Sequence, residues 1–387
     1  MGVCTALSGR VAILTSNHLE PSGMRQVYGG AERYGVELTH LLLDLGHEVE
    51  WWQIGNHWKK EIIPGVPLRG VPESDFPYQT MPHLNQVFFE QAVDADFAIY
   101  FVTFLAYPTA LPRSISVSHG IYWDHPGTDK FHATEPEREE WMRRLQLAIG
   151  AVRRVVSVDT ATINWVRATW PTLAQKFSYV PNFVDLDAFH PADRPDRAGR
   201  RLRVAFPRRA TTVRGVNEAG KAALWLTEAD PDIEVHFVGR AHDDGMERTM
   251  MAWASSHDRL FYYWLPPHLM PDLYRHADVA WIPSKSSEGT SLACLEAMAS
   301  GCAVITTPVG GLPDLVQDNY SGLLIEPTAR GLYEATVRLQ RDPKLRERLG
   351  RHAREVAETF GLARWRAGWT AAIEDAFGTA PQATSPG

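Results

Sequence analysis

The sequence predicts an α/β protein built from two doubly wound domains. The chain has 387 residues, which is enough for two domains of ordinary size with a core each. Near its start, a strand pattern (10–17), an amphipathic helix pattern (31–45) and a second strand pattern (47–54) follow one another. Strand and helix patterns alternate again over residues 202–327. This alternation is typical of parallel sheets covered by helices.

The composition predicts a soluble globular protein. Hydrophobic residues make up 44% and charged residues 22% of the chain, unlike a disordered sequence. The net charge of −7 argues against general nucleic-acid binding, which needs a basic surface. Cys4, Cys294 and Cys302 form neither a disulfide framework nor a zinc motif, and no apolar run reaches about 18 residues. We therefore expect a cytoplasmic protein with no transmembrane segment and no nucleic-acid partner, while peripheral membrane contact and oligomeric state stay open.

Gly29 and Gly30 lie where the first loop meets the helix pattern 31–45. Glycines there let the backbone approach a ligand phosphate, and a helix start favours an anion. By themselves the two glycines also fit a plain loop-to-helix turn. No GxGxxG motif follows the first strand, which removes the main support for a dinucleotide-dependent dehydrogenase. Residues 55–90 are rich in proline and aromatic residues with little periodicity, and we assign no element or role to them.

Two further strand patterns, 94–102 and 113–120, continue the first domain. The second ends in His119 and Gly120, at the edge where open α/β sheets bind ligands. A strand-end histidine is also common as a structural residue. The following loop contains Trp123, Asp124, His125, Asp129 and His132. Their spacing fits no usual metal site, so we interpret the loop as polar, with an acceptor-facing role as the functional alternative.

Domain limits follow from a polar, proline-containing run at 192–201, interpreted as the connector. We expect an N-terminal domain over 1–190, a C-terminal domain over 191–361, a last helix over 362–377 and a disordered tail over 378–387.

The stretch 286–301 is the strongest candidate for a binding site. An apolar strand pattern precedes it, a turn carries Glu288 and Gly289, and a helix pattern begins at Leu292. Thr290 and Ser291 are N-cap candidates for that helix. Its free N–H groups favour an anion, and two carboxylates flank the position, Glu288 just outside the helix and Glu296 about one turn inside. One anion position between two carboxylates fits a sugar nucleotide, although isolated glutamates are more often solvated surface charges.

Glu288 and Glu296 stand eight positions apart, and AMASGCAVITTPVGGLPDLV follows the second. This arrangement resembles the signature of the GT-B glycosyltransferases of family GT4, the retaining group that includes glycogen synthases and mannosyltransferases. GGAERYGVELTHLLLDLGHEV, which starts at Gly29, resembles the N-terminal pattern of the same family. VPNFVD resembles its domain-crossing pattern VPNGVD, with Phe183 where glycine is usual. The resemblance extends from about residue 11 to residue 377.

The resemblance implies two Rossmann-like domains that face each other across a deep cleft, with the last helix crossing back to the first domain. The first domain would bind the acceptor and the second the nucleotide-sugar donor. Arg209 and Arg214, five residues apart and with Gly215 following, match the family's diphosphate clamp, except that Arg214 replaces the usual lysine. His119 matches a histidine near the donor sugar. Thr290 and Ser291 stand where many relatives have Phe-Gly, which leaves the donor's identity open.

We therefore assign catalytic roles to His119 and Glu288. The donor-binding residues would be Gly29, Gly30, Arg209, Arg214, Gly289, Thr290, Ser291, Leu292 and Glu296. GVNEAGKA, from Gly215, imitates a phosphate-binding loop but ends in Ala222 where Ser or Thr is required, so an NTPase is not indicated.

The implied function is a retaining hexosyltransferase that uses a nucleotide-diphosphate sugar and a hydroxyl acceptor. No cofactor and no metal are expected, because arginines and a helix start would stabilise the leaving diphosphate. No carboxylate stands out as a nucleophile, which favours a front-face mechanism. A glycan phosphorylase, a sugar-nucleotide epimerase and a non-catalytic nucleotide-sugar-binding subunit remain as alternatives. The sequence does not identify the nucleotide, the sugar or the acceptor.

Overall fold

The computed structural model describes residues 9–25, 27, 29–75, 80–121, 134–192, 200–286 and 288–378. The chain forms two compact units. The first consists of Met1–His119, Trp123–Val180 and Arg366–Gly387, and the second of Gly120–Tyr122 and Pro181–Trp365. The units change at Val180 and Trp365, whereas the sequence placed its limits after residues 190 and 361; the extent of the two domains stays a prediction.

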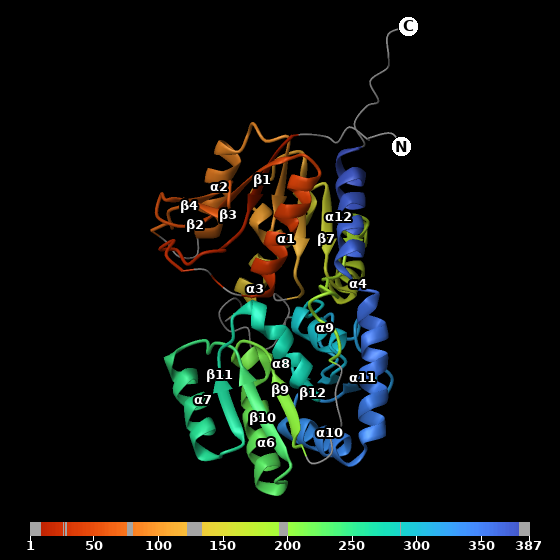
Figure 1. The fold of residues 1–387 in the computed structure, drawn as a ribbon. Helices are drawn as coiled ribbons and strands as arrows, with labels where there is room; N and C mark the ends of the chain where they lie inside the picture. The colour runs from red at the N-terminus through yellow and green to blue at the C-terminus, as the bar shows by residue number, and fades with distance from the viewer. Residues whose placement is uncertain are drawn as a thin grey trace. The chain divides into compact units, whose positions relative to one another are not determined.

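The first unit is built on a sheet with the strand order β3-β4-β2-β1-β5-β6-β7-β8 (Figure 1). Neighbouring strands run parallel, except that β3 and β4 are antiparallel. The strands are β1 (Arg10–Leu14), β2 (Glu48–Ile54), β3 (Lys59–Ile63), β4 (Val66–Val71), β5 (Phe97–Tyr100), β6 (Ser114–Ser118), β7 (Arg154–Ser157) and β8 (Phe177–Tyr179). The helices are α1 (Gly30–Asp44), α2 (Thr80–Gln91), η2 (Thr103–Ala106), α3 (Glu135–Ala151), α4 (Thr160–Thr169) and α5 (Pro171–Ala174).

The segment left unassigned by the sequence contains the hairpin β3–β4 and all but the last residue of α2. Three of the five residues of β3 are exposed, because this strand forms the edge of the sheet, and its sequence therefore lacks an apolar pattern. Trp58 precedes the hairpin, and its indole Nε1–H donates to the carbonyl of Pro21 at 2.9 Å. This bond ties the loop after β1 to the hairpin.

The second unit has a six-stranded parallel sheet in the order β11-β10-β9-β12-β13-β14. Its strands are β9 (Leu202–Phe206), β10 (Ile233–Val238), β11 (Leu260–Tyr263), β12 (Val279–Ile282), β13 (Ala303–Thr306) and β14 (Leu323–Leu324). Its helices are η3 (Thr212–Arg214), α6 (Val216–Ala229), α7 (Asp244–Ser256), η4 (Pro267–Leu269), α8 (Met270–His276), α9 (Leu292–Ala299), α10 (Ala329–Arg341) and α11 (Pro343–Glu358).

Helices cover both faces of this second sheet. One hydrophobic cluster joins the sheet to α6, α7 and α10, and another joins it to α8 and α9, while α11 contributes to both. Burial on both faces makes the strands nearly uniformly apolar, as the four fully buried residues of β12 and of β13 show. The predicted doubly wound α/β architecture is thus confirmed in each unit.

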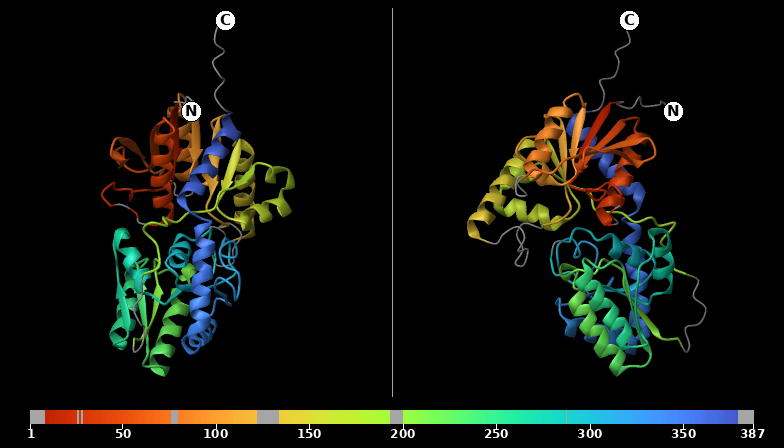
Figure 2. Two further views of the ribbon diagram at one scale, coloured as in Figure 1. Left: turned by 45° about the vertical axis from the view of Figure 1, so that its right-hand side comes forward. Right: turned by 90° about the vertical axis from the view of Figure 1, so that its left-hand side faces the viewer.

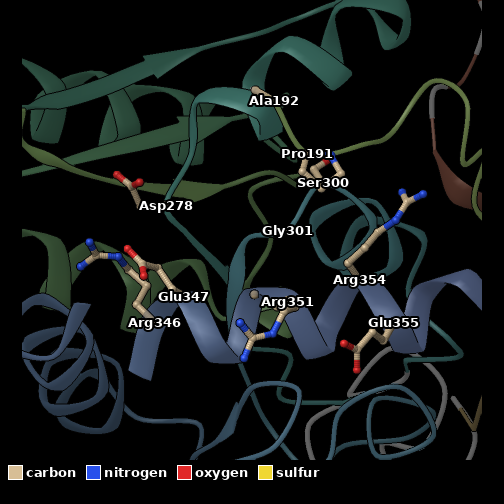
Figure 3. Close-up of a pocket in the computed structure, with 11 residues that line it drawn as sticks. Pro191, Ala192, Asp278, Ser300, Gly301, Arg346, Glu347, Arg351, Arg354 and Glu355 are labelled. Atoms are coloured by element: carbon tan, nitrogen blue, oxygen red, sulfur yellow. The ribbon is translucent and has the colours of Figure 1, made fainter. Parts of the chain in front are cut away.

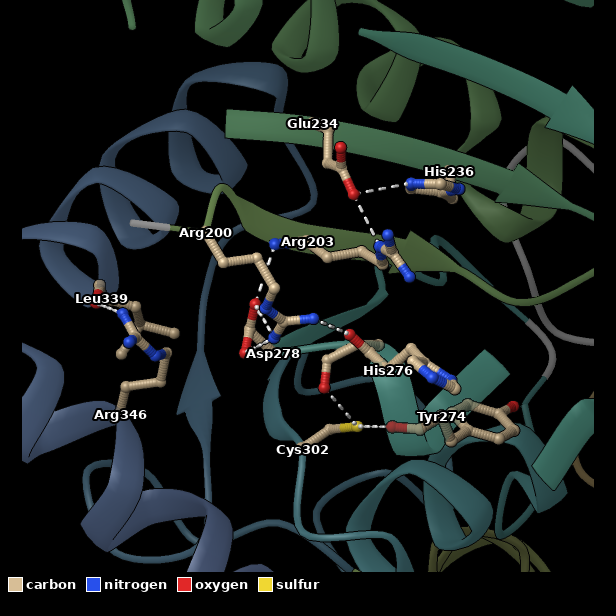
Figure 4. A network of polar contacts seen from close by, with 11 residues as sticks. Arg200, Arg203, Glu234, His236, Tyr274, His276, Asp278, Cys302, Leu339 and Arg346 are labelled. Atoms are coloured by element: carbon tan, nitrogen blue, oxygen red, sulfur yellow. Dashed lines mark hydrogen bonds and ion pairs between the residues drawn. The ribbon is translucent and has the colours of Figure 1, made fainter. Parts of the chain in front are cut away.

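Asp278 fastens the amino ends of β9 and β12 together (Figure 4). Its side chain is 3% exposed, forms an ion pair with Arg200 at 3.0 Å, and accepts the backbone N–H of Arg203 at 2.9 Å. Arg203 in turn donates to Glu234 of β10 at 2.6 Å. These contacts fix the relative register of the three central strands, whose other ends carry the candidate site.

The last helix, α12 (Leu362–Phe377), has the bounds that the sequence predicts. From Arg366 onward it belongs to the first unit, where it lies beside the sheet (Figure 2). The indole of Trp369 donates to the hydroxyl of Tyr34 on α1 at 2.6 Å, and the ring of Phe377 lies 4.5 Å from that of Phe97. The C-terminal helix therefore returns to the first unit, as expected.

Several sequence predictions lie outside the described residues. These are the loop with Trp123, Asp124, His125, Asp129 and His132, most of the connector 192–201, and the tail beyond Gly378. Within the ranges that the structure describes, no helix has both the length and the apolar character needed to span a bilayer.

Candidate functional site

The strand order of the second unit indicates where a ligand should bind. From β9 the chain winds outward through β10 and β11, then returns to the other side of β9 to form β12. Open α/β sheets bind ligands outside the carboxyl ends of the strands at such a reversal. Arg208 follows the end of β9, and Glu288 follows the end of β12. The strongest sequence candidate therefore lies at the position that the topology selects.

Glu288 is held by two guanidinium groups and one hydroxyl. Arg208 Nη2 donates to Glu288 Oε2 at 2.7 Å, and Arg214 Nη1 and the hydroxyl of Ser284 donate to the same oxygen. Arg208 also donates to Ser284 Oγ at 2.8 Å, which closes the network. The side chains of Arg208 and Glu288 are each 7% exposed, whereas that of Arg214 is 31% exposed. Arg214 thus retains a solvent-facing surface beside the carboxylate.

The network keeps Glu288 ionised. Burial alone raises the pKa of its carboxyl, but the charges of Arg208 and Arg214 outweigh burial and lower that pKa to about 2. Burial also lowers the pKa of Arg208, an effect that the Glu288 carboxylate opposes. The nearby thiol of Cys294 has a raised pKa because of burial, so this cysteine is a neutral packing residue.

Two glycines bring the surrounding loops close enough to form this network. Gly215 has φ +78°, and a Cβ on it would lie 2.1 Å from the carbonyl oxygen of Pro283. Gly310 has φ +56°, and its Cβ would lie 1.9 Å from the carbonyl oxygen of Glu288. Both positions require glycine for conformation and for space. They place the loop that carries Arg214 and the loop after β13 against the backbone that carries Glu288.

The turn before α9 is fixed by side-chain bonds. The hydroxyl of Ser291 accepts the N–H of Cys294, so Ser291 is the N-cap residue that the sequence predicts as one of two candidates. The hydroxyl of Thr290 accepts the N–H of Asn182 at 2.7 Å instead. Both residues are buried, and Leu292, the first residue of α9, is 7% exposed. The contact of these residues and of Gly289 with a donor stays a prediction.

Glu296 lies inside α9 and is 2% exposed. The hydroxyl of Tyr274, on α8, donates to Glu296 Oε2 at 3.1 Å. A carboxylate this deeply buried costs considerable free energy unless hydrogen bonds satisfy it, so its presence in an otherwise apolar helix indicates a role. The solvated-surface interpretation of Glu288 and Glu296 is wrong for this chain, because both side chains are buried.

The second arginine that contacts Glu288, besides Arg214, is Arg208, whereas the sequence pattern assigned the clamp to its neighbour Arg209. Arg209 is exposed, and its part in a diphosphate clamp remains a prediction. The two arginines are adjacent, and the spacing to Arg214 was the only signal that separated them. Both arginines lie in the loop after β9, which ends at Phe206, and the structure shows that Arg208 is the one that turns inward to Glu288.

In the first unit, Gly29 and Gly30 form the start of the fifteen-residue helix α1, after the carboxyl end of β1. Gly29 is its extended N-cap, at φ −164°, and makes no side-chain cap. The free N–H groups of this helix start are consistent with the predicted anion contact. The strand order reverses between β1 and β5, so this position is the ligand-binding edge of the first sheet.

His119 follows β6 at the same edge of the first sheet. Its Nε2 lies 3.0 Å from the carbonyl oxygen of Phe101, which can only accept, so Nε2 carries the proton and Nδ1 has the lone pair. Burial lowers the pKa of His119 to about 4, although the bond to Phe101 opposes the shift. His119 is therefore neutral near pH 7 and offers Nδ1 as a hydrogen-bond acceptor.

Gly120, the next residue, is grouped with the second unit. Its φ is +118°, and a Cβ on it would lie 3.0 Å from the backbone nitrogen of Gly289. The close approach of these two backbones leaves no room for a side chain at position 120.

A hollow of about 340 Å³ lies elsewhere in the second unit, and the predicted site residues do not line it (Figure 3). Its wall includes Asp278, Ser300 and three arginines of α11: Arg346, Arg351 and Arg354. Asp278 precedes β12 whereas Glu288 follows it, so the hollow is at the opposite end of that strand. Among the described residues, no group of three His, Cys, Asp or Glu side chains could hold a metal ion.

The two sheets, each largely parallel and with polar groups at its carboxyl edge, match the two Rossmann-like domains of the GT-B fold. A family model described as "Glycosyl transferases group 1" matches residues 193–356, and one described as "Glycosyltransferase Family 4" matches residues 28–188. Together these matches cover most of both units. The chain belongs to the GT-B glycosyltransferases of family GT4.

Curated relatives carry glycosyltransferase names. A D-inositol 3-phosphate glycosyltransferase of Geodermatophilus obscurus is 36% identical over 233 residues, which are 54% of this chain and 50% of that protein. The chain thus spans about half the length of the first curated relatives that it matches. A protein of the same name from Kribbella flavida is 27% identical over 86% of this chain and 87% of its own length.

Solved structures share the fold at low identity. Sucrose-phosphate synthase from Thermosynechococcus elongatus has a TM-score of 0.76 at 18% identity and covers 95% of this chain and 99% of its own. Anabaena HepE in complex with UDP-glucose has a TM-score of 0.71 at 13% identity and covers 95% and 100%.

Proposed function

We propose that this protein transfers a hexosyl-type sugar from a nucleotide-diphosphate sugar to a hydroxyl acceptor. The observation that carries the proposal is the buried carboxylate of Glu288, held by Arg208 and Arg214 at the carboxyl edge of the second sheet, beside the start of α9. Guanidinium groups and free helix N–H groups bind phosphate, and carboxylates accept hydrogen bonds from sugar hydroxyls.

The two guanidinium groups that hold Glu288 would have different tasks. Arg208 is almost fully buried and spends its donors on Glu288 and Ser284, so it orients the carboxylate. Arg214 is partly exposed, so its charge faces solvent where a diphosphate would bind, and it would hold the diphosphate together with Arg209 and the start of α9. Positive charge at this place stabilises the diphosphate as it leaves.

The remaining donor contacts are assigned from the hydrogen-bonding chemistry of each residue. Glu296 would accept hydrogen bonds from the ribose hydroxyls, and Glu288 from hydroxyls of the donor sugar. His119 would accept a sugar hydroxyl at Nδ1, and the start of α1 at Gly29 and Gly30 would approach the phosphates. The structure of Anabaena HepE in complex with UDP-glucose supports a nucleotide-sugar donor for this fold.

For the reaction we propose a retaining, front-face displacement without a metal. The bond between the anomeric carbon and the diphosphate oxygen breaks, and the acceptor oxygen forms a bond to the same carbon on the same face. The acceptor's proton passes to the departing phosphate oxygen, so no protein base is required. Arg214 and the α9 start supply the positive charge that a divalent cation provides in other transferases.

The acceptor is the least constrained part of the proposal. The names of the curated relatives make D-inositol 3-phosphate the first acceptor to test. A panel that adds lipid-linked sugars and small hydroxylated molecules distinguishes the other acceptor classes.

Thermal stabilisation by UDP-, GDP- and ADP-sugars tests donor binding, because a ligand that binds only the folded state raises the melting temperature. We expect one nucleotide class to stabilise the wild-type protein, and Glu296→Ala to abolish that stabilisation. Glu288→Gln should keep nucleoside diphosphate binding and lose transfer by about 100-fold or more.

Unchanged turnover in Glu288→Gln would rule out its assigned role. Anomer analysis of the product by NMR tests retention, and turnover in EDTA tests metal independence. Sugar phosphate released from a glycan by phosphate would identify a phosphorylase instead. Conversion of the donor without acceptor would identify an epimerase, and binding without turnover a non-catalytic subunit.

A further inference from the structure

The C-terminal helix reaches the neighbourhood of His119 through one side chain of α1. Trp369 of α12 is fully buried, and its indole Nε1–H donates to the hydroxyl of Tyr34 at 2.6 Å. Tyr34 is 1% exposed and presents its ring edge to His119, with the ring centroids 5.2 Å apart and the planes at 85°. These three aromatic residues belong to the first unit.

His119 is confined on its other sides by Phe101. The carbonyl of Phe101 accepts the proton of His119 Nε2, and the ring of Phe101 lies 4.9 Å from the imidazole. The ring of Tyr34 also contacts that of Phe101, with centroids 5.8 Å apart. One hydrogen bond leaves an imidazole free to rock about that bond, so its orientation depends on the ring packed against its face or edge. That ring is Tyr34.

We propose that Trp369 and Tyr34 are positioning residues for His119 in the transfer reaction. Trp369 holds the Tyr34 hydroxyl, the Tyr34 ring then fixes the plane of the imidazole, and Nδ1 keeps the direction in which it accepts a donor-sugar hydroxyl. The C-terminal helix thereby contributes to the active site without touching the substrate. This inference rests on the proposed function, in which His119 contacts the sugar.

Two substitutions break the same hydrogen bond from opposite sides. Tyr34→Phe removes only the hydroxyl and keeps the ring beside His119, whereas Trp369→Phe removes the indole N–H. Misorientation of a substrate-contacting group lowers the rate steeply, and we expect each variant to lose about 10-fold in kcat. The double variant should lose no more than the larger single loss, because both changes remove one interaction. Nucleoside diphosphate affinity should stay unchanged, since neither substitution removes a group that is proposed to contact the diphosphate.

A matched control separates positioning from docking of the helix. Arg366 forms an ion pair with Asp44 that also joins α12 to α1, but at the surface. Arg366→Gln should therefore leave kcat unchanged. A loss of kcat in Arg366→Gln equal to that in Trp369→Phe, or a fall in melting temperature that accounts for the lost activity, would show a merely structural role and overturn the proposal.

An NMR titration of labelled histidine tests the inference independently of turnover. His119 is identified as the resonance missing from His119→Gln. In the wild-type protein its pKa should be near 4, and in Tyr34→Phe and Trp369→Phe it should rise toward the ordinary value of 6.5 as the packing that excludes water loosens. An unchanged pKa and an unchanged kcat would refute the positioning role. If no donor and acceptor give turnover, the proposed function fails, while a shifted pKa still supports the packing role of Trp369 and an unshifted one rejects it.

Discussion

Arg208 shows how one buried side chain can decide the state of an active-site carboxylate. It is as buried as Glu288 itself and bonds both to Glu288 and to Ser284. A buried carboxylate without a paired cation becomes protonated rather than remain charged. The ionised form of Glu288, whose Oε2 accepts hydrogen bonds from Arg208, Arg214 and Ser284, therefore depends on this arginine together with Arg214.

Replacing Arg208 by glutamine should lower kcat by about 100-fold, comparable to losing one donor of an oxyanion hole. Burial would then dominate at Glu288 and raise its pKa from about 2, so the acid limb of the pH–rate profile should move to higher pH. Steady-state kinetics between pH 4 and pH 8 measure both effects. Arg208→Lys keeps the charge and should retain the wild-type acid limb.

Arg209→Gln is the matched comparison, because Arg209 is the exposed neighbour. It should raise the donor KM and leave the acid limb in place if Arg209 binds the diphosphate. An acid limb that stays fixed in Arg208→Gln but moves in Arg209→Gln would reverse the assignment of the two arginines.

Much of the candidate site is predictable from residue spacing. The eight-residue interval placed Glu288 before α9 and Glu296 inside it, and the turn chemistry identified Ser291 as a cap candidate. The choice between Arg208 and Arg209 was not predictable, because two adjacent arginines look alike in sequence and only the structure shows which one turns inward. The contact of Tyr34 with Trp369 joins residues 335 positions apart, and no local pattern contains that information.

At the scale of the element, the loop after β13 shapes the site through its backbone. Gly311 N–H donates to the carbonyl of Glu288 at 2.9 Å, and Gly310 lies against the same carbonyl. This loop holds the turn that precedes α9 in place without contributing a side chain. In the sequence, this loop is recognisable only by its glycine pair, Gly310 and Gly311.

Gly310→Ala should destabilise the protein and lower nucleoside diphosphate affinity. The added Cβ would lie 1.9 Å from the Glu288 carbonyl oxygen, so the backbone that carries Glu288 must move. Overpacking of this kind costs about 1–3 kcal/mol in addition to the strain of a positive φ. The melting temperature and the dissociation constant measure the two effects.

Gly65→Ala separates backbone strain from the clash. Gly65 also has a positive φ, +83°, but nothing lies within 4 Å of its Cβ position. It should cost about 1–2 kcal/mol of stability and leave nucleotide affinity unchanged. Equal effects of Gly65→Ala and Gly310→Ala on stability and affinity would contradict the role given to the loop.

Buried strands and helices were predictable from their apolar sequences, whereas the strands at the edge of the first sheet were not. β12 and all but the first residue of β1 are buried and apolar, and helix α9 begins at Leu292 as the sequence predicts. By contrast, β3 is mostly exposed, and β4 contains a proline, Pro67, and a glycine, Gly70. Their pairing is determined by the neighbouring strand rather than by their own sequence.

For the whole molecule, the structure predicts that stability falls between about pH 6.5 and pH 4. Burial lowers the pKa of His18, which is 3% exposed, and the pKa of His119 to about 4 each. Their unfolded pKa of 6.5 lies higher, so the unfolded state binds more protons in this window and gains stability as the pH falls. The contribution of His18 is on the order of 3 kcal/mol.

Glu288 does not contribute to this window. Its folded pKa is lowered from 4.5 to about 2, so its stabilisation is complete above about pH 4.5 and is lost only as the pH falls toward 2. Melting temperatures at pH 7.5 and pH 5 measure the effect of the histidines. His18→Gln should reduce the difference between them, whereas His40→Gln, at an exposed position, should not. Equal slopes for wild type and His18→Gln would contradict the assignment.

Calorimetric titration of UDP, GDP and ADP in the presence of EDTA tests most directly whether the second unit binds a nucleoside diphosphate through Arg214. We predict that one of the three binds the wild-type protein with a stoichiometry of one. Arg214→Ala should weaken that binding by about 10-fold or more, the usual loss for a charged hydrogen bond. Arg330→Ala, which removes an arginine whose side chain is 82% exposed on α10, should leave it unchanged. Binding of equal strength in the wild type and Arg214→Ala would contradict the account.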